Sequence, residues 1–238
     1  MKKLLLIAGG LVALGVLAFA ALIGISLLRD DDPNLLTSAP EITPGPDTAP
    51  PSGSSSAPLA GVLKFVIDPS GSEVKYVVRE TLRGVIGVNA VGATNAISGE
   101  IYLTPEGLAP GITSTFTVDL RELRTDESMR DNFVRQNVLQ TNRFPNAEFI
   151  AQSITGFPTG YVEGQEVPMT LRGDLTIHGV TKPVEWAVKA RRAGDTLTGI
   201  ADLSFNMSEY GITPPSVPVA RAEDGVQLQI TILAKLAA

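Results

Sequence analysis

The stretch LTIHGVTKPVEW, residues 175–186, contains the chain's single histidine, His178, and its single tryptophan, Trp186. Apolar and polar residues alternate up to Ile177, and the alternation resumes at Val184. Because successive side chains of a strand point to opposite faces, both halves of the stretch are predicted to be strands. The glycine that follows the histidine is a turn signal, so the whole stretch predicts a β-hairpin.

The same alternation recurs through residues 62–238 and is clearest over residues 226–236, where apolar residues occupy every second position. Glycine, proline, asparagine or aspartate separates most of these runs, so neighbouring strands are expected to pair antiparallel. The sequence therefore predicts an all-β domain of about eight strands. A closed barrel and a two-sheet sandwich both satisfy this pattern, and the barrel also removes exposed strand edges.

One segment, residues 124–149, breaks the alternation. Thr125 is placed to cap a helix, and Met129 and Phe133 are four residues apart on one face of it. The helix is expected to end before Pro145. We expect a short helix that either lies over one mouth of the barrel or packs on its core.

The N-terminus has the properties of a membrane anchor. After two lysines, an uncharged apolar run extends from Leu4 to Leu28. As a helix at about 1.5 Å per residue it is about 37 Å long, which exceeds the hydrocarbon core of about 30 Å. The flanking charges favour a cytoplasmic N-terminus. Residues 1–30 are therefore predicted to be a transmembrane helix, with a signal peptide cleaved after Ala18-Phe19-Ala20 as the alternative.

Both a membrane anchor and a cleaved signal peptide imply that the rest of the chain is exported. The barrel domain is then expected on the extracytoplasmic side of the cell membrane, or secreted or periplasmic if the leader is cleaved. Residues 31–61 are rich in proline, serine and glycine. Such a composition buries too little apolar surface to offset its ordering entropy, so a disordered linker is predicted there. Residues 62–238 form the single folded domain.

Composition excludes several kinds of chemistry. The chain has no cysteine, which excludes disulfides and cysteine-based metal sites, and its single histidine excludes a two-histidine zinc site. A net charge of −6 argues against a nucleic-acid partner. His178 falls in register with Thr176, away from the apolar face, where a hairpin histidine is expected to bond a backbone group of the turn. No catalytic residue, metal or cofactor is expected.

Three stretches, taken together, resemble one family. They are FVIDPSGSEVKYVVRE (65–80), TVDLRELRTDESMRDNFVRQNVLQTNRFPNAEF (117–149) and GDLTIHGVTKPVEW (173–186). They are similar to the YceI family of lipocalin-like, polyisoprenoid-binding proteins. The resemblance implies an extended antiparallel barrel with a helical segment near one mouth, enclosing an elongated apolar cavity for an isoprenoid chain.

The chain departs from that family in two places. The family often has a histidine near the position of Gly71, and an arginine where this chain has Met207. The loss of polar groups at the mouth weakens recognition of a charged headgroup such as a diphosphate. A neutral, quinone-like lipid is the expectation that follows.

The sequence therefore predicts a membrane-tethered protein that sequesters or carries an isoprenoid or quinone-like lipid without catalysis. An interaction module with a filled core, acting through the loop Gly211–Gly225, is the alternative, and an enzyme with His178 as acid or base ranks third. The candidate residues for the lining of the apolar cavity are Tyr76, Val78, Phe116, Val118, Met129, Phe133, Phe144, Phe149, Leu175, Ile177, Trp186, Leu203, Phe205 and Tyr210.

Overall fold

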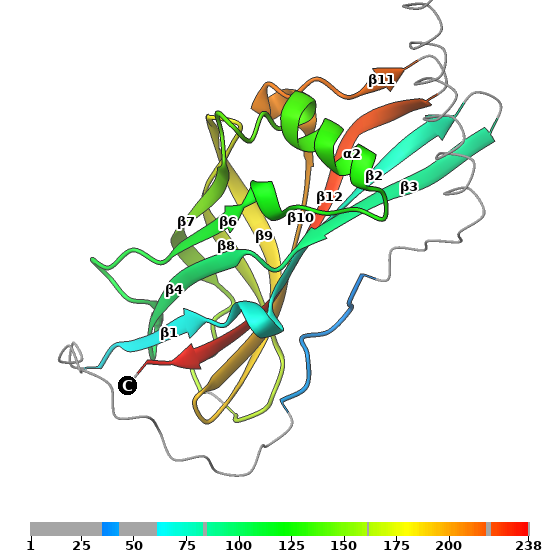
Figure 1. The fold of residues 1–238 in the computed structure, drawn as a ribbon. Helices are drawn as coiled ribbons and strands as arrows, with labels where there is room; N and C mark the ends of the chain where they lie inside the picture. The colour runs from blue at the N-terminus through cyan, green and yellow to red at the C-terminus, as the bar shows by residue number, and fades with distance from the viewer. Residues whose placement is uncertain (1–34, 43–60, 83–84, 161, 218–219, 238) are drawn as a thin grey trace, which may run out of the picture.

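The computed structural model describes residues 35–42, 61–82, 85–160, 162–217 and 220–237 (Figure 1). The strands are β1 (Leu63–Ile67), β2 (Glu73–Leu82), β3 (Val85–Thr94), β4 (Ile97–Thr104), β5 (Gly107–Leu108), β6 (Thr115–Asp119), β7 (Asn146–Thr155), β8 (Val167–Ile177), β9 (Val180–Ala193), β10 (Thr196–Asn206), β11 (Ser216–Val217) and β12 (Ala220–Leu236). The helical elements are η1 (Pro69–Gly71), η2 (Leu120–Glu122), α2 (Ser128–Phe133), η3 (Val134–Val138) and η4 (Met207–Tyr210). The predicted anchor, residues 1–30, lies outside these ranges. None of the helices described is both long and apolar enough to cross a bilayer.

The strands form a closed antiparallel barrel of eight strands, as predicted, and not a sandwich. β12 pairs with β10 along one edge, and β1 and β2 follow one another along its other edge. β4 pairs with β1, and β3 pairs with β2. From β4 the sheet continues through β6, β7, β8 and β9 back to β10. The pairing of Phe65 with Leu236 closes the ring.

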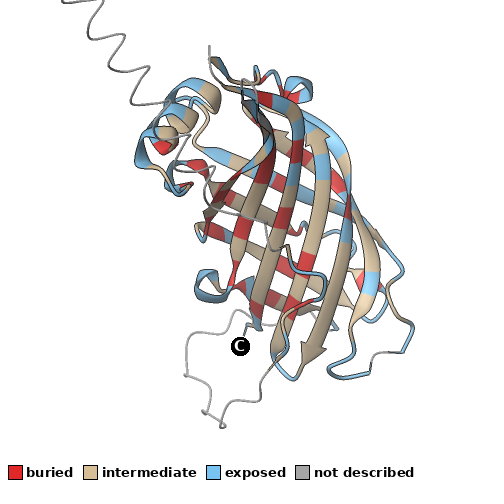
Figure 2. Ribbon diagram, turned by 90° about the vertical axis from the view of Figure 1, so that its right-hand side faces the viewer, coloured by how far each residue is buried: buried red, intermediate tan, exposed pale blue. Residues whose placement is uncertain are grey.

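The hairpin predicted for residues 175–186 forms between β8 and β9, with Ile177 paired to Val180 across a two-residue turn. His178 and Gly179 both have positive φ, 52° and 75°. This is the backbone of the primed turns, whose twist matches that of the strands they join. Along the strands, buried residues alternate with more exposed ones (Figure 2), because one face of each strand points into the barrel.

The interior divides into two parts along the barrel. The packed half lies at the end where β1 meets the C-terminal end of β12, and its centre is formed by Phe65, Ile67, Ile101 and Ala234, all buried. The cavity half lies at the other end, where α2 is found (Figure 1). It contains a second buried cluster, which includes Phe149, Leu175, Trp186, Met207 and Ile212.

The predicted helix is present but shorter, and its cap is different. Thr125 does not cap it, because its backbone N–H and its hydroxyl both donate to Asp131 Oδ1, at 2.6 and 2.7 Å. Glu127 takes the capping position instead and accepts from the Met129 N–H at 3.3 Å. After Phe133 the chain continues as the single π-helical turn η3.

Residues 35–42 differ from the free spacer that composition predicts. This segment, here called the strap, lies along the outside of the barrel and is drawn in blue in Figure 1. The Leu36 N–H donates to Gln229 Oε1 at 2.8 Å, and Gln229 Nε2 donates back to the Leu36 carbonyl at 2.9 Å. The rest of the predicted linker lies mostly outside the described residues.

Candidate functional site

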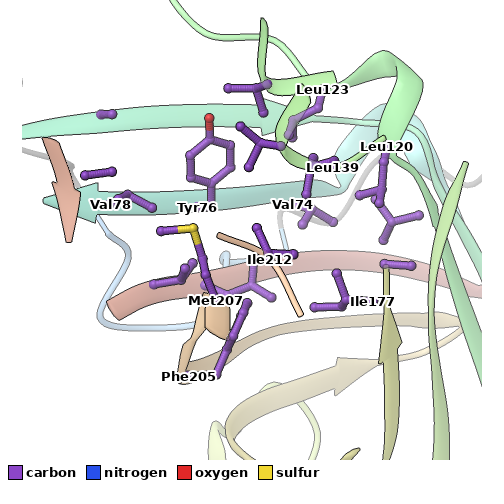
Figure 3. Close-up of a pocket in the computed structure, with 18 of the residues that line it drawn as sticks. Val74, Tyr76, Val78, Leu120, Leu123, Leu139, Ile177, Phe205, Met207 and Ile212 are labelled. Carbon is purple, nitrogen blue, oxygen red and sulfur yellow. The ribbon is translucent and has the colours of Figure 1, made fainter. Parts of the chain in front are cut away.

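The cavity half contains an internal cavity of about 210 Å³ (Figure 3). For comparison, an apolar cavity of about 150 Å³ is large enough to bind benzene. Most of its wall is aliphatic or aromatic. The residues contributed by the barrel strands include Val74, Tyr76, Val78, Ala90, Ile97, Phe116, Val118, Ala147, Phe149, Leu175, Ile177, Trp186, Phe205, Ala222, Val226, Leu228 and Ile230.

Helical residues form the wall on one side of the cavity. Met129 and Phe133 of α2 line it together with Val134 and Val138, which repeat the same four-residue spacing on η3. Side chains four apart lie on one face of a helix, so this spacing turns a single apolar stripe toward the cavity. Met129 and Phe133 are also 48% and 36% exposed to solvent, so the cavity has its mouth at this segment.

The loop Gly211–Gly225 forms another part of the wall. It is not a loop throughout, because it contains β11, and β12, with which β11 pairs, already begins at Ala220. Ile212 is buried, and Pro215 and Val217 also line the cavity. The loop suggested by the sequence as an interaction surface therefore turns apolar side chains inward.

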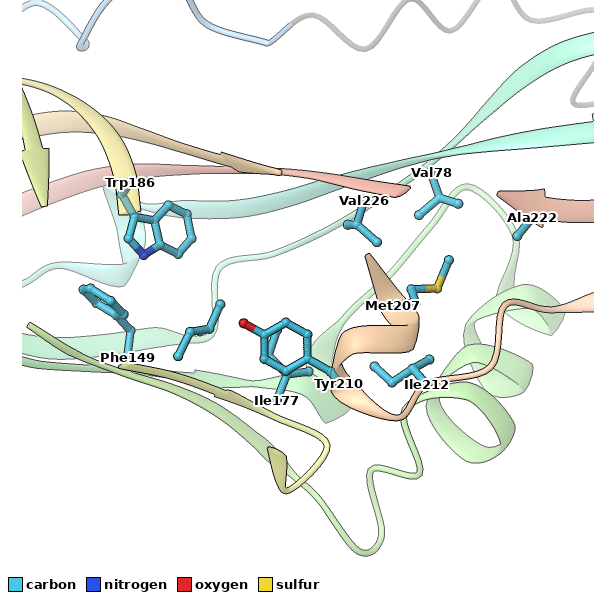
Figure 4. Close-up of a cluster of buried hydrophobic side chains, with 10 residues drawn as sticks. Val78, Phe149, Ile177, Trp186, Met207, Tyr210, Ile212, Ala222 and Val226 are labelled. Carbon is cyan, nitrogen blue, oxygen red and sulfur yellow. The ribbon is translucent and has the colours of Figure 1, made fainter. Parts of the chain in front are cut away.

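Aromatic rings cluster deep in the cavity half (Figure 4). Phe149 packs edge-on against Trp186 with ring centroids 5.8 Å apart, and it lies 6.0 Å from Phe116. Gly173 makes this arrangement possible, because a Cβ there would come within 2.7 Å of the Phe149 ring. Trp186 is only 2% exposed, and its Nε1–H has no hydrogen-bond partner among the described residues. A buried unpaired donor at a cavity wall is a place where a ligand acceptor would be stabilised.

The few polar residues in the wall lie near the mouth. Arg130 lines the cavity, and its guanidinium makes an ion pair with Asp126 at 2.6 Å. Burial raises the pKa of Glu80, and the nearby Asp126 carboxylate raises it further, against the opposing effect of Arg130. Burial likewise raises the pKa of Tyr76. Arg130 is the one basic residue among the described lining residues, and it is already paired.

The sequence candidates for the cavity lining fall into two groups. Tyr76, Val78, Phe116, Val118, Met129, Phe133, Phe149, Leu175, Ile177, Trp186 and Phe205 lie in the cavity wall. Their role in holding a ligand stays a prediction.

Three candidates lie elsewhere. Tyr210 is fully buried in η4, stacked edge-on against Phe205 at 5.1 Å, and burial raises its pKa to about 12. Leu203 packs among the half-buried residues of the same cluster without reaching the wall. Phe144 precedes β7 and packs against the His178 ring at 4.5 Å.

Several cavity residues are not among the sequence candidates. Met207 and Ile212 follow β10, where the period-two pattern has ended, and Leu120, Leu123 and Leu139 flank the helical segment. Each is an apolar residue in an irregular segment. That pattern predicts burial but not the surface against which the side chain is buried.

His178 lies at the hairpin turn, as expected, but makes a different contact from the one expected. Its ring packs on Phe144 rather than on a backbone group of the turn, and its Nε2 is buried without a hydrogen-bond partner in the described structure. It is not among the cavity-lining residues. In the described ranges, no three histidine, aspartate or glutamate side chains are grouped so as to hold a metal ion.

Comparison with known proteins agrees with this architecture. A protein of Shewanella putrefaciens in the UPF0312 group is 26% identical over 188 residues, which cover 74% of this chain and 90% of the relative. The structure of a polyisoprenoid-binding domain from Saccharophagus degradans matches with a TM-score of 0.60 at 14% identity, covering 74% of this chain and 99% of that domain. BcnA of Burkholderia cenocepacia matches with a TM-score of 0.56 at 22% identity, over 71% and 99% of the two chains. Residues 65–234 match the model of the YceI-like domain, and the chain therefore belongs to the YceI family.

Proposed function

We propose that this protein is a membrane-tethered, extracytoplasmic binding protein that holds one long-chain, isoprenoid-type lipid in the cavity half of its barrel. The observation that carries the proposal is the apolar cavity of about 210 Å³, which reaches solvent at α2. An empty apolar cavity destabilises a fold in proportion to its size, so a cavity of this kind is most readily explained by an apolar cargo. The Saccharophagus degradans domain of similar fold is named for polyisoprenoid binding.

The wall favours a cargo with a neutral headgroup. A diphosphate needs unpaired basic side chains or exposed backbone N–H groups, whereas Arg130 is paired and Glu80 adds a carboxylate to the wall. The unpaired indole N–H of Trp186 favours a headgroup that carries a hydrogen-bond acceptor, such as a carbonyl oxygen. A quinone with an isoprenoid tail has both properties.

The proposed activity is binding, without the making or breaking of a covalent bond. The cavity wall is almost wholly apolar, and His178, the chain's single histidine, lies outside it. The location on the extracytoplasmic side follows from the sequence of residues 1–30, in which two lysines precede the apolar run.

Native mass spectrometry of residues 35–238, exported and purified without detergent, tests the proposal. We expect one apolar adduct per chain, extractable and identifiable as an isoprenoid lipid. The bare polypeptide mass, unchanged after incubation with isoprenoid quinones, would contradict it.

A further inference from the structure

The strap is held to the barrel through its main chain. Leu36 is bonded at both its N–H and its carbonyl, at 2.8 and 2.9 Å, by the side-chain amide of Gln229. Three further main-chain groups of the strap are bonded by barrel side chains, namely the Thr37 carbonyl by Lys189, the Ala39 N–H by Glu166 and the Pro40 carbonyl by Thr198. Main-chain groups are common to all residue types, so these bonds recognise an extended peptide and not a particular set of side chains.

One position of the strap requires a small side chain. Ala39 is 2% exposed, whereas Leu36 is 44% exposed and Thr37 and Ser38 are also exposed. Pro40 restricts the residue before it to extended backbone, the conformation that these contacts need. The contacts therefore select for a small residue followed by proline and tolerate many residues before them.

The barrel is buried on its outer face where the strap crosses it. Gln229 points outward, because its neighbours Leu228 and Ile230 line the cavity, yet it is only 3% exposed. Thr198 and Ile200 of β10 also point outward, since the odd-numbered residues of that strand face the interior, and they are 4% and 1% exposed. The strap covers this surface, because it bonds Gln229 near one end and Thr198 near the other.

The residues that the strap bonds or covers are here called the strap site, and they are Glu166, Lys189, Thr198, Ile200 and Gln229. Two of them are also held by the barrel itself. Gln229 Nε2 donates to Asp202 Oδ1 at 2.7 Å, and Glu166 is paired with Arg191 at 3.2 Å. Side chains that are already oriented cost less to order when a peptide binds.

The chain between the strap and β1 is longer than the connection requires. Thr198 pairs with Leu233, whose carbonyl accepts from the Asp68 N–H just after β1. Two strand spacings and the length of β1 therefore separate the end of the strap from the start of β1 by roughly 20 Å. Residues 41–62 reach roughly 70 Å when extended. The strap can therefore leave the strap site and return without displacing β1.

From these contacts and this length of chain we infer that the strap site is a peptide-binding site separate from the cavity, and that the strap is its tethered and releasable occupant. Its ligand is an extended segment with a small residue, followed by proline, where the strap has Ala39. When the strap is released, a partner protein that presents such a segment docks on the outer face of β10 and β12. The inference depends neither on membrane anchoring nor on the cargo of the cavity.

The linker supplies an internal control for testing this inference, because Ser38-Ala39-Pro40 of the strap recurs as Ser56-Ala57-Pro58. A protease recognition sequence inserted between Pro58 and Leu59 of the full chain allows both Ser-Ala-Pro segments to be severed from the barrel. Native mass spectrometry in detergent micelles then measures how much of the N-terminal fragment stays bound. We expect Ala39→Trp to release the fragment and Ala57→Trp to leave it bound.

A second pair of variants tests the barrel side of the contact. Gln229→Ala removes both bonds to Leu36, and Gln227→Ala, an exposed residue on the same face of β12, is its control. A fluorescent peptide of residues 35–42 should bind the cleaved Gln229→Ala chain about tenfold more weakly than the wild type, as measured by anisotropy. Gln227→Ala should leave the affinity unchanged. In excess, the same peptide should displace the fragment from the cleaved wild-type chain, whereas the peptide with Ala39→Trp should not.

Several results would overturn the inference. Complete release of the fragment on cleavage, together with no binding of the peptide, would show that only the covalent connection holds the strap in place. A fragment that stays bound against excess peptide would show that the strap is not releasable. Equal effects of Ala39→Trp and Ala57→Trp would remove the strap as the occupant, and these two variants decide the question even if Gln229→Ala fails to fold. An uncut chain found only as a dimer would make a second copy the source of the occupant.

Discussion

The packed half and the cavity half are made largely by the same strands, and the cavity lies in one of them, with Val74, Ile97 and Val118 of the packed cluster at its border. β12 crosses both, with Ala234 buried at 0% exposure among Phe65 and Ile67, and Ala222 buried at 6% beside the cavity. In the packed half the residues of β1 fill the interior. In the cavity half the helical segment and the loop after β10 replace part of the sheet wall, and their side chains surround a space rather than fill it. The comparison teaches that one barrel can combine a stabilising core with a binding site.

The largest expected effect lies in the packed half. Phe65→Ala removes a fully buried ring, and we expect a loss of about 3–5 kcal/mol in the free energy of unfolding, measured by urea denaturation. The matched change in the cavity half, Phe205→Ala, removes a half-buried ring that already borders empty space, and we expect a smaller loss. Similar losses for the two variants would contradict the division of the interior.

A pair of alanines on β12 sharpens the comparison. Ala234→Phe forces a ring into filled space and should cost about 1–3 kcal/mol or more, while leaving the cavity open. Ala222→Phe places the same ring where space exists, so we expect a loss below about 1 kcal/mol together with loss of bound lipid. Thermal unfolding and native mass spectrometry of both variants measure the two effects. Retention of lipid by Ala222→Phe would show that the cargo lies elsewhere.

A smaller effect is expected at the deep end of the cavity. Trp186→Phe removes the unpaired indole N–H but keeps an aromatic ring in the wall. If that N–H donates to a carbonyl of the cargo, the affinity for an isoprenoid quinone should fall by about two- to tenfold. The affinity for an isoprenoid hydrocarbon of equal length should stay the same. Equal losses for the two ligands, measured by titration calorimetry, would rule out a specific hydrogen bond.

The smallest effect concerns pH. Because burial raises the pKa of Glu80 in the folded state, the folded protein binds more protons than the unfolded one at pH values above about 4.5. Its contribution to stability therefore falls as the pH rises from there through the raised pKa. Glu80→Gln should unfold at a higher temperature than the wild type at pH 7, and the advantage should vanish near pH 4. A difference that does not change with pH would contradict this assignment.

The parts of the fold that follow from period-two alternation are predicted well by the sequence. The hairpin around His178, the long strand β12 and the helical excursion at Met129 all form where the pattern indicates. Periodicity assigns a side chain to the inner face but not to a depth, so it places Leu203 at the cavity although other side chains cover it.

The strap and the division of the interior were not predictable by the same means. The strap is held through backbone groups of residues 36–40, which bond side chains more than a hundred positions away, so its local composition carries no signal of docking. The space in the cavity half depends on how η4, α2 and residues 211–217 pack together. That packing is irregular and has no sequence period.

The single tryptophan offers the most direct test of the central claim, that the cavity half holds one apolar lipid. Trp186 lies in the cavity wall, and a bound quinone would quench its fluorescence. Titration of lipid-free residues 35–238 with an isoprenoid quinone should give saturable quenching at one equivalent, which Ala222→Phe abolishes. Quenching that does not saturate, or that is the same in Ala222→Phe, would contradict the account.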